Sequence, residues 1–544
     1  MKYPVFIATT AFSLLLIMLF GAQLHGQTDA GELRVLVVDS SEAIAPGVAV
    51  KLVNEATGTS STRNTNADGY SVFSPISRGT YTAEVAAMNF KTVRLTEVTV
   101  DVNEKRLVKV ILKPSSISET VEVTAEPAAL QTEEASLGQV VRGDVAVQLP
   151  LQGRRYTDLA LLAPGVTVAT DLNPVTRGPD WFVANGNYQT QNNFLLDGFD
   201  NNQGTTNAQA LSSEVVRPSP DAINEFKVQT NSYSAEFGRS AGAVINVSLK
   251  SGTNLVHGSA WYYNRDKALA ANSWLNNFTG LPKQDLAWHQ FGGTLGGPLV
   301  RNKLFYFGDY EGFHRTFSDT YLRDVPTVAE KLGDFSQLAF PIFDPQTGLP
   351  FPGNVIPQNR WDTLGAKIVN LYPDPNLSGT QVSSGRFIEN YGAVRPDREN
   401  THKFDIRSDY YATQRNQFAL RYSFLQQNIF RSGIFPGNTA DCGSQDCNTG
   451  KQYNRNQSMG ASWTRTLSPQ IVNVVRFGYY RTYATFAHTS ADGPTAAAFG
   501  FRGIPSDLPK TGGLPRIQMS NYQELGTRNF RPQFQKPHLY GILD

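Results

Sequence analysis

The chain has 544 residues, which is too many for one small domain and enough for several. Its 48 Lys and Arg residues balance 47 Asp and Glu residues, so the overall charge gives no reason to expect nucleic acid or an anionic partner. Charged residues make up only 17% of the sequence and aromatic residues 11%, a composition that suits strands facing lipid.

The first 27 residues have the features of an export signal. Lys2 precedes an apolar stretch from Val5 to Ala22, after which polar residues begin. We expect cleavage between Ala22 and Gln27; a retained anchor is the alternative, because the stretch approaches the length of a spanning helix. No long apolar run follows, so a mature protein in a membrane would have to form a barrel.

Residues 33–113 predict a small β-sandwich of immunoglobulin-like shape, because short strands and turns recur at regular spacing. The expected strands are Leu33–Val38, Val48–Val53, Tyr70–Phe73 and Tyr81–Val85. The order Pro46-Gly47-Val48, Asp68-Gly69-Tyr70, Gly79-Thr80-Tyr81 resembles the carboxypeptidase-regulatory-like domain. That domain is non-catalytic in its family, so the resemblance implies no activity.

Residues 130–253 carry a second resemblance. A short helix is expected at Tyr156–Leu162, and Ala243–Lys250 alternates apolar and polar residues as a strand does. The matching segments are Leu195-Leu196-Asp197-Gly198, Glu225-Phe226-Lys227-Val228, Ser234–Gly238 and Gly242–Val247. In this order they resemble the plug domain of TonB-dependent outer-membrane transporters, and especially the Oar-like branch with a regulatory-like domain before the plug.

The resemblance implies that the plug closes a wide barrel and is held by ion pairs that can be broken. We expect four charged residues of the plug to lie against the barrel wall in this way: Arg154, Arg177, Glu225 and Arg239. The alternative is that these side chains satisfy loop carbonyls within the plug, where they would have no gating role.

The linker before the plug contains a segment, 118–125, that resembles the TonB box. Such a box is an extended peptide that the energy-transducing protein TonB captures by strand addition. Its residues are Glu119, Thr120, Val121, Glu122, Val123, Thr124 and Ala125. The alternatives are a last strand of the sandwich or a plain linker.

From residue 257 to 544 the sequence predicts antiparallel membrane strands. Phe418, Leu420, Tyr422 and Phe424, for example, alternate with polar or small residues, as in an outer-membrane barrel. Asp324–Asn400 and Asp492–Lys536 are expected to be extracellular loops, and Leu539–Asp544 to be loop as well. Two segments, Gln290–Pro298 and Lys303–Gly312, also resemble Oar-like barrels.

These lengths leave room for roughly ten strands, whereas a plugged barrel has about 22. We therefore expect the N-terminal part of a longer transporter. The alternative is a small barrel, whose lumen would not hold a plug of this size. The predicted fold class is mainly β: an immunoglobulin-like sandwich, an α+β plug and a partial antiparallel transmembrane barrel.

The only two cysteines, Cys442 and Cys447, stand in a polar loop. In an exported protein they are expected to form a disulfide, with two free thiols as the alternative. No His has a Glu three residues on, and the P-loop, Rossmann and serine-hydrolase motifs do not occur. We expect neither catalysis nor a metal or other cofactor.

The sequence thus favours a TonB-dependent outer-membrane importer, with its N-terminal domain in the periplasm. Its expected partners are TonB with the inner-membrane energising complex, outer-membrane lipid, and a substrate that is a small molecule, oligosaccharide or peptide. The alternative is an Oar-like adhesion or matrix-assembly protein without transport. The box discriminates the two, because an adhesin needs no energy-coupling strand.

Overall fold

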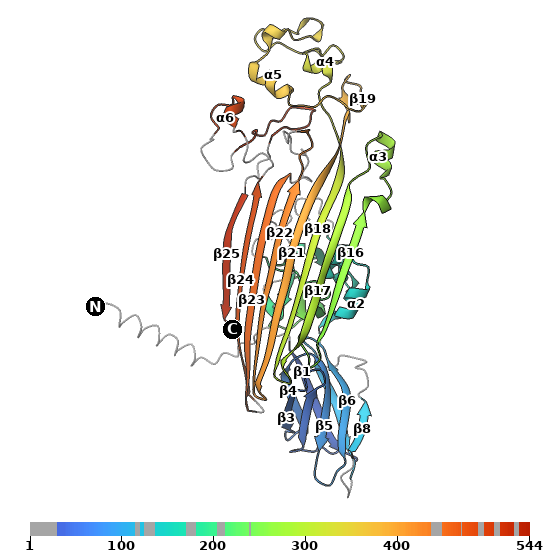
Figure 1. Ribbon diagram of the computed structural model, residues 1–544, viewed down its shortest axis with the longest axis vertical. Helices are drawn as coiled ribbons and strands as arrows, with labels where there is room; N and C mark the ends of the chain where they lie inside the picture. Colours follow the sequence, from blue (N-terminus) through green and yellow to red (C-terminus); the bar gives the residue numbers. More distant parts are fainter. Residues whose placement is uncertain are drawn as a thin grey trace, which may run out of the picture.

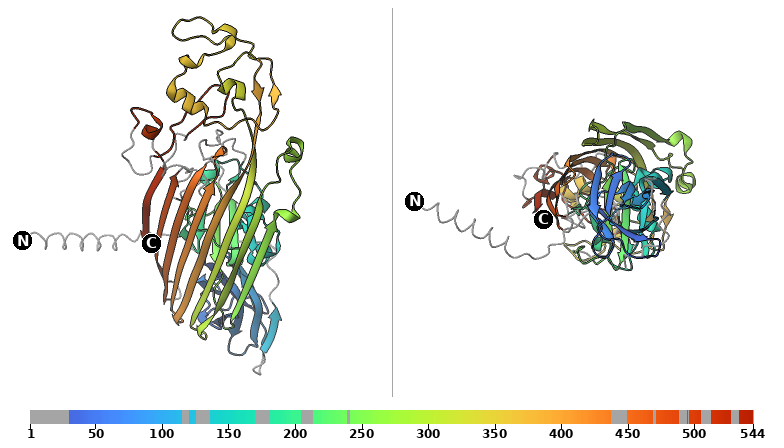
Figure 2. Two further views of the ribbon diagram at one scale, coloured as in Figure 1. Left: turned by 45° about the horizontal axis from the view of Figure 1, so that its top comes forward. Right: turned by 90° about the horizontal axis from the view of Figure 1, so that it is seen from below.

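The computed structural model describes residues 30–114, 120–124, 136–169, 181–203, 213–238, 241–436, 449–468, 471–487, 494, 496–504, 512–526 and 533–543. A tall curved sheet, which we call the wall, stands between a β-sandwich at one end and long loops at the other (Figure 1). The domain predicted to be a plug, described here between residues 136 and 253 and called the plug below for brevity, lies on the concave side of the wall (Figure 2). The predicted signal segment 1–27 lies outside the described residues.

The N-terminal sandwich packs two sheets face to face over one apolar core, as its alternating strands predict. Buried side chains such as Leu33, Val50 and Phe73 come from both sheets. One sheet has the order β4-β1-β7, with β1 (Gly31–Asp39), β4 (Tyr70–Ile76) and β7 (Lys105–Leu112). The other has the order β3-β2-β5-β6-β8, with β2 (Ala49–Asn54), β3 (Ser60–Asn64), β5 (Gly79–Ala86), β6 (Thr92–Val100) and β8 (Thr120–Thr124).

The plug is built on a five-stranded sheet with short helices packed against it. The sheet order is β13-β12-β15-β14-β9, with β9 (Leu137–Arg142), β12 (Asn193–Leu196), β13 (Phe199–Asp200), β14 (Ile223–Asn231) and β15 (Val244–Leu249). Around it lie α2 (Gly143–Gln148), η1 (Gln152–Arg154), η2 (Tyr156–Leu162), η3 (Gln189–Gln191), β10 (Val166–Val168) and β11 (Phe182–Ala184). The helix expected at Tyr156–Leu162 is therefore present, as a 3-10 helix.

The predicted strand near Ala243–Lys250 is the central strand β15 of this sheet. It lies between β12 and β14, and every residue of Val244–Leu249 is buried. The polar residues Asn246 and Ser248 are thus enclosed together with their apolar neighbours. The alternating apolar and polar residues therefore lie on the two faces of the strand, and both faces are buried.

The wall is an antiparallel sheet of eight strands among the described residues, open between its edges β16 and β25. Its strands are β16 (His257–Asp266), β17 (Leu286–Val300), β18 (Leu304–Arg323), β21 (Tyr391–Thr413), β22 (Asn416–Arg431), β23 (Gly450–Ser468), β24 (Ile471–Ala487) and β25 (Gln533–Leu543). There are eight where roughly ten were expected, because the strands are longer than a bilayer requires. β21 alone has 23 residues, against about 9–11 for a membrane crossing.

The loops at the far end contain regular structure. The β18–β21 connection holds α4 (Val328–Lys331), η5 (Pro352–Asn354), η6 (Gln358–Arg360), α5 (Thr363–Val369), β19 (Thr380–Gln381) and β20 (Phe387–Ile388). The other described helices are η4 (Lys267–Leu269), α3 (Trp274–Thr279) and α6 (Ala496–Phe499). None of the helices in the described part of the chain has the length and apolar content to cross a membrane.

Two loop predictions were wrong at their edges. Residues 391–400 belong to β21, and 533–543, including most of the segment expected to be loop at Leu539–Asp544, belong to β25. In both places a long neighbouring strand supplies main-chain partners, with one register shift between β24 and β25. This pairing overrides the proline and polar content that favoured a loop.

Candidate functional site

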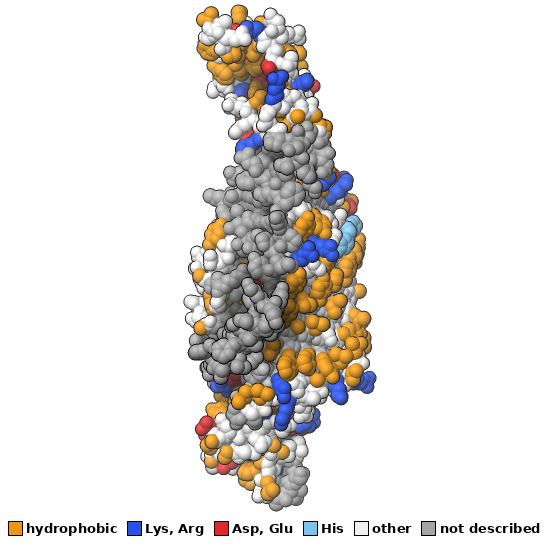
Figure 3. Space-filling view, turned by 90° about the vertical axis from the view of Figure 1, so that its left-hand side faces the viewer, with side chains coloured by type: hydrophobic (Ala, Val, Ile, Leu, Met, Phe, Trp, Pro, Cys, Tyr) orange, Lys and Arg blue, Asp and Glu red, His pale blue; other side chains and the backbone are white. Residues whose placement is uncertain are grey.

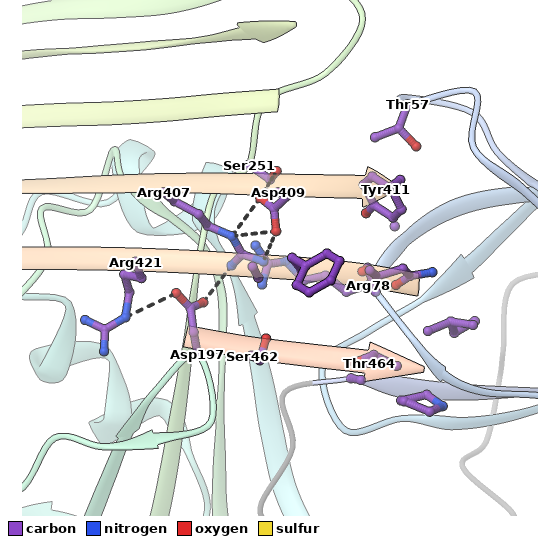
Figure 4. Close-up of a pocket in the computed structure, with 18 of the residues that line it drawn as sticks. Thr57, Arg78, Asp197, Ser251, Arg407, Asp409, Tyr411, Arg421, Ser462 and Thr464 are labelled. Carbon is purple, nitrogen blue, oxygen red and sulfur yellow. Dashed lines mark hydrogen bonds and ion pairs between the residues drawn. The ribbon is translucent and has the colours of Figure 1, made fainter. Parts of the chain in front are cut away.

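A cavity of about 240 Å³ lies where the plug, the wall and the sandwich meet, at the sandwich end of the molecule. The sandwich contributes Arg78, the plug contributes Asp197, and the wall contributes Arg407 and Arg421, with their side chains directed toward one another (Figure 4). The sandwich, the plug and the wall all line this cavity. A movement of the plug would therefore change its contacts with both the sandwich and the wall.

Asp197 is the centre of this interface. It lies in the tight turn between β12 and β13, where its own φ of 50° and that of Gly198 at 76° are both left-handed. Its Oδ1 accepts hydrogen bonds from the Leu249 amide at 2.9 Å and from Arg407 Nη1 at 2.8 Å. Its Oδ2 lies 3.6 Å from Arg421 Nε. A plug carboxylate that is only 7% exposed is thus paired with two arginines of the wall.

Arg407 links this carboxylate to further groups at the same interface. Its Nε also donates to Asp409 Oδ2 at 3.0 Å, and Ser251 of the plug donates to the same oxygen at 2.5 Å. Arg78 of the sandwich donates to the main-chain carbonyl of Leu249. The end of the plug sheet is therefore held from the wall and from the sandwich at once.

Phe199 follows Asp197 in the same turn and fills a hollow in the wall that two glycines create. A Cβ built on Gly460 would lie 2.6 Å from the Phe199 ring, and one on Gly478 would lie 3.2 Å from it. The guanidinium carbon of Arg421 lies 5.9 Å from the ring centre. We call Asp197, Phe199, Arg407 and Arg421 the lower lock.

A second set of contacts joins the plug to the wall nearer the loops. Arg154 pairs with Asp221 inside the plug, and its Nε lies 3.2 Å from Glu311 Oε2 on β18. The same guanidinium lies over the rings of Trp261 and Tyr263 on β16, at 5.1 and 4.9 Å from their centres. Its place against the wall matches the expectation for Arg154, and we call this set the upper lock.

Glu225 lies elsewhere than expected. Its Oε1 accepts a hydrogen bond from the Val102 amide at 2.5 Å, and the neighbouring Lys227 donates to the Asn103 carbonyl at 3.0 Å. Both partners stand in the β6–β7 loop of the sandwich. Burial raises the pKa of the Glu225 carboxyl to about 7, and the nearby carboxylates of the sandwich act in the same direction. Glu225 therefore joins the plug to the sandwich.

The structure describes few of the other predicted site residues. Arg177, Arg239, Cys442 and Cys447 lie outside the described residues, as do Glu119 and Ala125 at the two ends of the box. The rest of the predicted box is the strand β8, which pairs in parallel with β6, so that Val121 lies opposite Val93. It is an edge strand of the sandwich with all five residues exposed.

The lower lock was not predicted as a site, although its turn carried the family resemblance. A polar residue in a left-handed turn between two strands is the signal that could have identified Asp197. Arg407 and Arg421 stand at positions of alternating strands where charge has to face away from lipid. Their pairing with Asp197, more than 200 positions earlier in the chain, depends on the fold and cannot be read from local pattern.

A pocket of about 380 Å³ lies on the loop side of the plug. Arg315 crosses it, donating to Glu399 at 2.7 Å and lying 4.1 Å from the ring centre of Phe317. Its lining combines aromatic and charged side chains of the wall with plug residues, among them Trp288, Phe313, Lys403, Arg431, Arg155 and Val215. The described residues contain no cluster of His, Cys, Asp and Glu that could hold a metal ion.

Two family models match the chain. Residues 32–113 match the carboxypeptidase regulatory-like domain, and residues 248–544 match the outer membrane beta barrel domain. The second match covers more than half of the chain. The chain belongs to this outer-membrane barrel family. The family, together with the relative described next, places the protein in the outer membrane.

A curated relative is the TonB-dependent transporter Oar of Myxococcus xanthus, 28% identical over 272 residues. The match covers 45% of this chain and 23% of that protein, so the chain spans only about a quarter of the length of this relative. The Oar-like resemblance predicted from the sequence is confirmed.

Among solved structures, the siderophore receptor PirA of Acinetobacter baumannii is similar, with 15% identity and a TM-score of 0.41. A variant of the ferric enterobactin receptor of Pseudomonas aeruginosa has 12% identity and the same TM-score of 0.41. Each match covers 73% of this chain and 45% of the other.

Proposed function

We propose that this outer-membrane barrel protein is a TonB-dependent importer whose plug is released from the wall when TonB pulls on the box. The observation that carries the proposal is the lower lock, in which one buried plug carboxylate is held by two wall arginines. Removing a partner from a buried ion pair costs about 3–5 kcal/mol. The lower lock therefore stabilises the plug in its closed position. Because it consists of only a few contacts, a pulling force that breaks them would release the plug.

The box is positioned to transmit such a force. β8 lies at the edge of the sandwich sheet and precedes the plug in the chain, so tension on it is directed into the plug sequence. Its exposed edge offers main-chain donors and acceptors to an added strand. TonB can pair with this edge or displace β8 from β6, where parallel pairing is the less stable arrangement.

Substrate binding is assigned to the pocket on the loop side of the plug. Its floor is plug and its sides are wall, so an occupant would touch the element that has to move. Aromatic faces next to arginine and carboxylate groups suit a polar ligand with apolar surface, such as an oligosaccharide or a peptide. Charged residues inside a membrane barrel commonly mark the path of the solute.

A transporter and an adhesion protein differ in whether TonB opens the barrel. The full-length protein is produced in cells with and without TonB, and entry of vancomycin, which intact outer membranes exclude, is recorded as growth inhibition. An Asp197→Asn/Arg154→Gln variant weakens both locks and is expected to admit vancomycin only when TonB is present. Inhibition that is equal without TonB, or absent in both strains, would contradict TonB gating. The relative matched by sequence is itself a transporter by name, so the comparisons lend no support to adhesion.

A further inference from the structure

The lipid-facing side of the wall changes character toward the loop end. Lower on the strands, outward positions carry large exposed apolar side chains such as Ile406, Leu420 and Phe477. Toward the loops several outward positions carry histidine or arginine. Figure 3 shows Lys, Arg and His side chains together at the upper edge of a broad hydrophobic band.

Three histidines from three adjacent strands meet on this side. His289 on β17 lies directly opposite His314 on β18. The ring of His402 on β21 meets that of His314 edge to face, with 5.2 Å between ring centres. All three alternate with inward-facing neighbours, such as the buried Gln290 and Lys403, so they belong to the outer surface of the wall.

The height of these histidines follows from strand geometry. His314 is ten residues beyond Leu304, the first residue of β18 after the short turn at the sandwich end. At about 3.3 Å per residue and a tilt of about 40°, ten residues rise roughly 25 Å. The apolar band of an outer-membrane barrel is also about 25 Å tall. The histidines therefore stand at the outer edge of the band, at the level of lipid headgroups.

The contacts of the His289 ring indicate which of its nitrogens carries the proton. Nδ1 of His289 lies 2.7 Å from the Tyr262 hydroxyl and 3.1 Å from the Asn264 amide nitrogen. An amide nitrogen only donates, so this Nδ1 accepts and Nε2 carries the ring proton. The Tyr310 hydroxyl also lies 2.7 Å from Nδ1 of His402, where either atom can be the donor.

Arginines on β21, β23 and β24 extend the row of histidines along the wall. Arg398, Arg455 and Arg481 are all exposed on the same outward side of β21, β23 and β24. Arg455 lies over the ring of Phe424 at 5.5 Å, as a guanidinium does at a boundary between apolar and polar surroundings.

Opposing negative charge is lacking at this level. From β17 to β24, no outward position among the described residues there is Asp or Glu. Next to β17, on and after β16, Asp266 accepts from the Ala268 amide, and Asp285 pairs with Lys267 at 2.7 Å. The outward positions of these strands therefore carry basic side chains without acidic ones, although the charge of the whole chain is balanced.

We propose that this surface binds the phosphate groups of lipids in the outer leaflet. Its members, which we call the basic rim, are His289, His314, His402, Arg398, Arg455 and Arg481. Guanidinium groups bind phosphate through paired donors, and imidazole N–H groups add further donors. Clustered basic side chains at headgroup level bind anionic lipid with a free energy that grows with each charge. The rim would fix the depth of the wall in the membrane.

The test uses the full-length protein purified in detergent and examined by native mass spectrometry with diphosphoryl lipid A, or with phosphatidylcholine as the neutral-lipid comparison. His289→Gln/His314→Gln/His402→Gln and, separately, Arg398→Gln/Arg455→Gln remove donors or charge. Arg465→Gln, an exposed arginine at the opposite end of β23, is the matched control. Heat-modifiable migration in gels verifies that each variant is folded.

We expect each rim variant to bind lipid A at least tenfold more weakly than the unaltered protein, with phosphatidylcholine binding and the control unchanged. Undiminished lipid A binding by both folded rim variants would overturn the proposal. So would displacement of lipid A by millimolar inorganic phosphate alone, because the rim would then be a site for the free anion.

Discussion

Asp197→Asn is the substitution that most directly probes how the plug is held. The new amide keeps an oxygen to accept from the Leu249 amide, and Arg407 keeps Asp409 at 3.0 Å. The loss falls on the ion pairs with Arg407 and Arg421, at 2.8 and 3.6 Å. Removing one partner of a buried ion pair costs about 3–5 kcal/mol. Because some contacts are retained, we expect Asp197→Asn to destabilise the closed plug by about 3 kcal/mol.

Hydrogen exchange of the plug reports this cost. Every 1.4 kcal/mol is about a tenfold change in an equilibrium constant, so local opening of β15 should rise roughly 100-fold. Exchange of peptides covering Val244–Leu249, read by mass spectrometry on the full-length protein in detergent, measures it directly.

Asp158→Asn is the matched control. Asp158 is also an aspartate of the plug, but it pairs at 3.2 Å with Arg155, which is itself part of the plug, and the pair is partly exposed. Such a pair is worth about 0–1 kcal/mol. Equal exchange of β15 in the two variants would refute the argument that the lower lock holds the plug.

Four further outcomes are expected. Val121→Pro removes a main-chain donor from the box, so a peptide of residues 115–129 with this change should lose measurable binding to the C-terminal domain of TonB in calorimetry. Cys442 and Cys447 should appear as one disulfide-linked species in non-reduced peptide mapping, and alkylation of both thiols would show otherwise. The raised pKa of Glu225 favours its protonated form in the docked state, so docking of the sandwich on the plug should be strongest below the ordinary carboxyl pKa and weaken as pH rises through about 7. Protection of the β6–β7 loop should therefore fall between pH 6 and 8, and Glu225→Gln should abolish that difference. Residues 28–114 alone should give a soluble β-protein with cooperative thermal unfolding, for which a random-coil circular dichroism spectrum would be the contrary result.

The spacing of apolar residues and turns predicted the fold class well, because this spacing differs between the sandwich and the wall. Strict alternation from Phe418 to Phe424 identified a wall strand, and short strands between Gly turns identified the sandwich. The same reasoning failed at Gln533–Leu543, where pairing with β24 determines the strand. It offered a last strand of the sandwich as one alternative for Val121, but it could not choose β6 as the partner, since strand partners depend on contacts between distant parts of the chain.

The neighbours of the predicted site residues depend on the fold. Arg154 lies against the wall and Glu225 against the sandwich, because a single sequence does not say which neighbour a plug face meets, and their gating role remains a prediction. Asp197 became recognisable as a lock only when Arg407 and Arg421 were placed around it. The proposed box and disulfide remain predictions.

Single-molecule pulling can test whether TonB releases the plug from the wall. The full-length protein is held in a supported bilayer and approached with a tip that carries the C-terminal domain of TonB. We expect the tip to capture the protein and to draw out plug sequence in steps while the wall stays folded, and we expect Asp197→Asn to lower the first force peak. Absence of capture, or unfolding of the wall before the plug, would contradict this expectation.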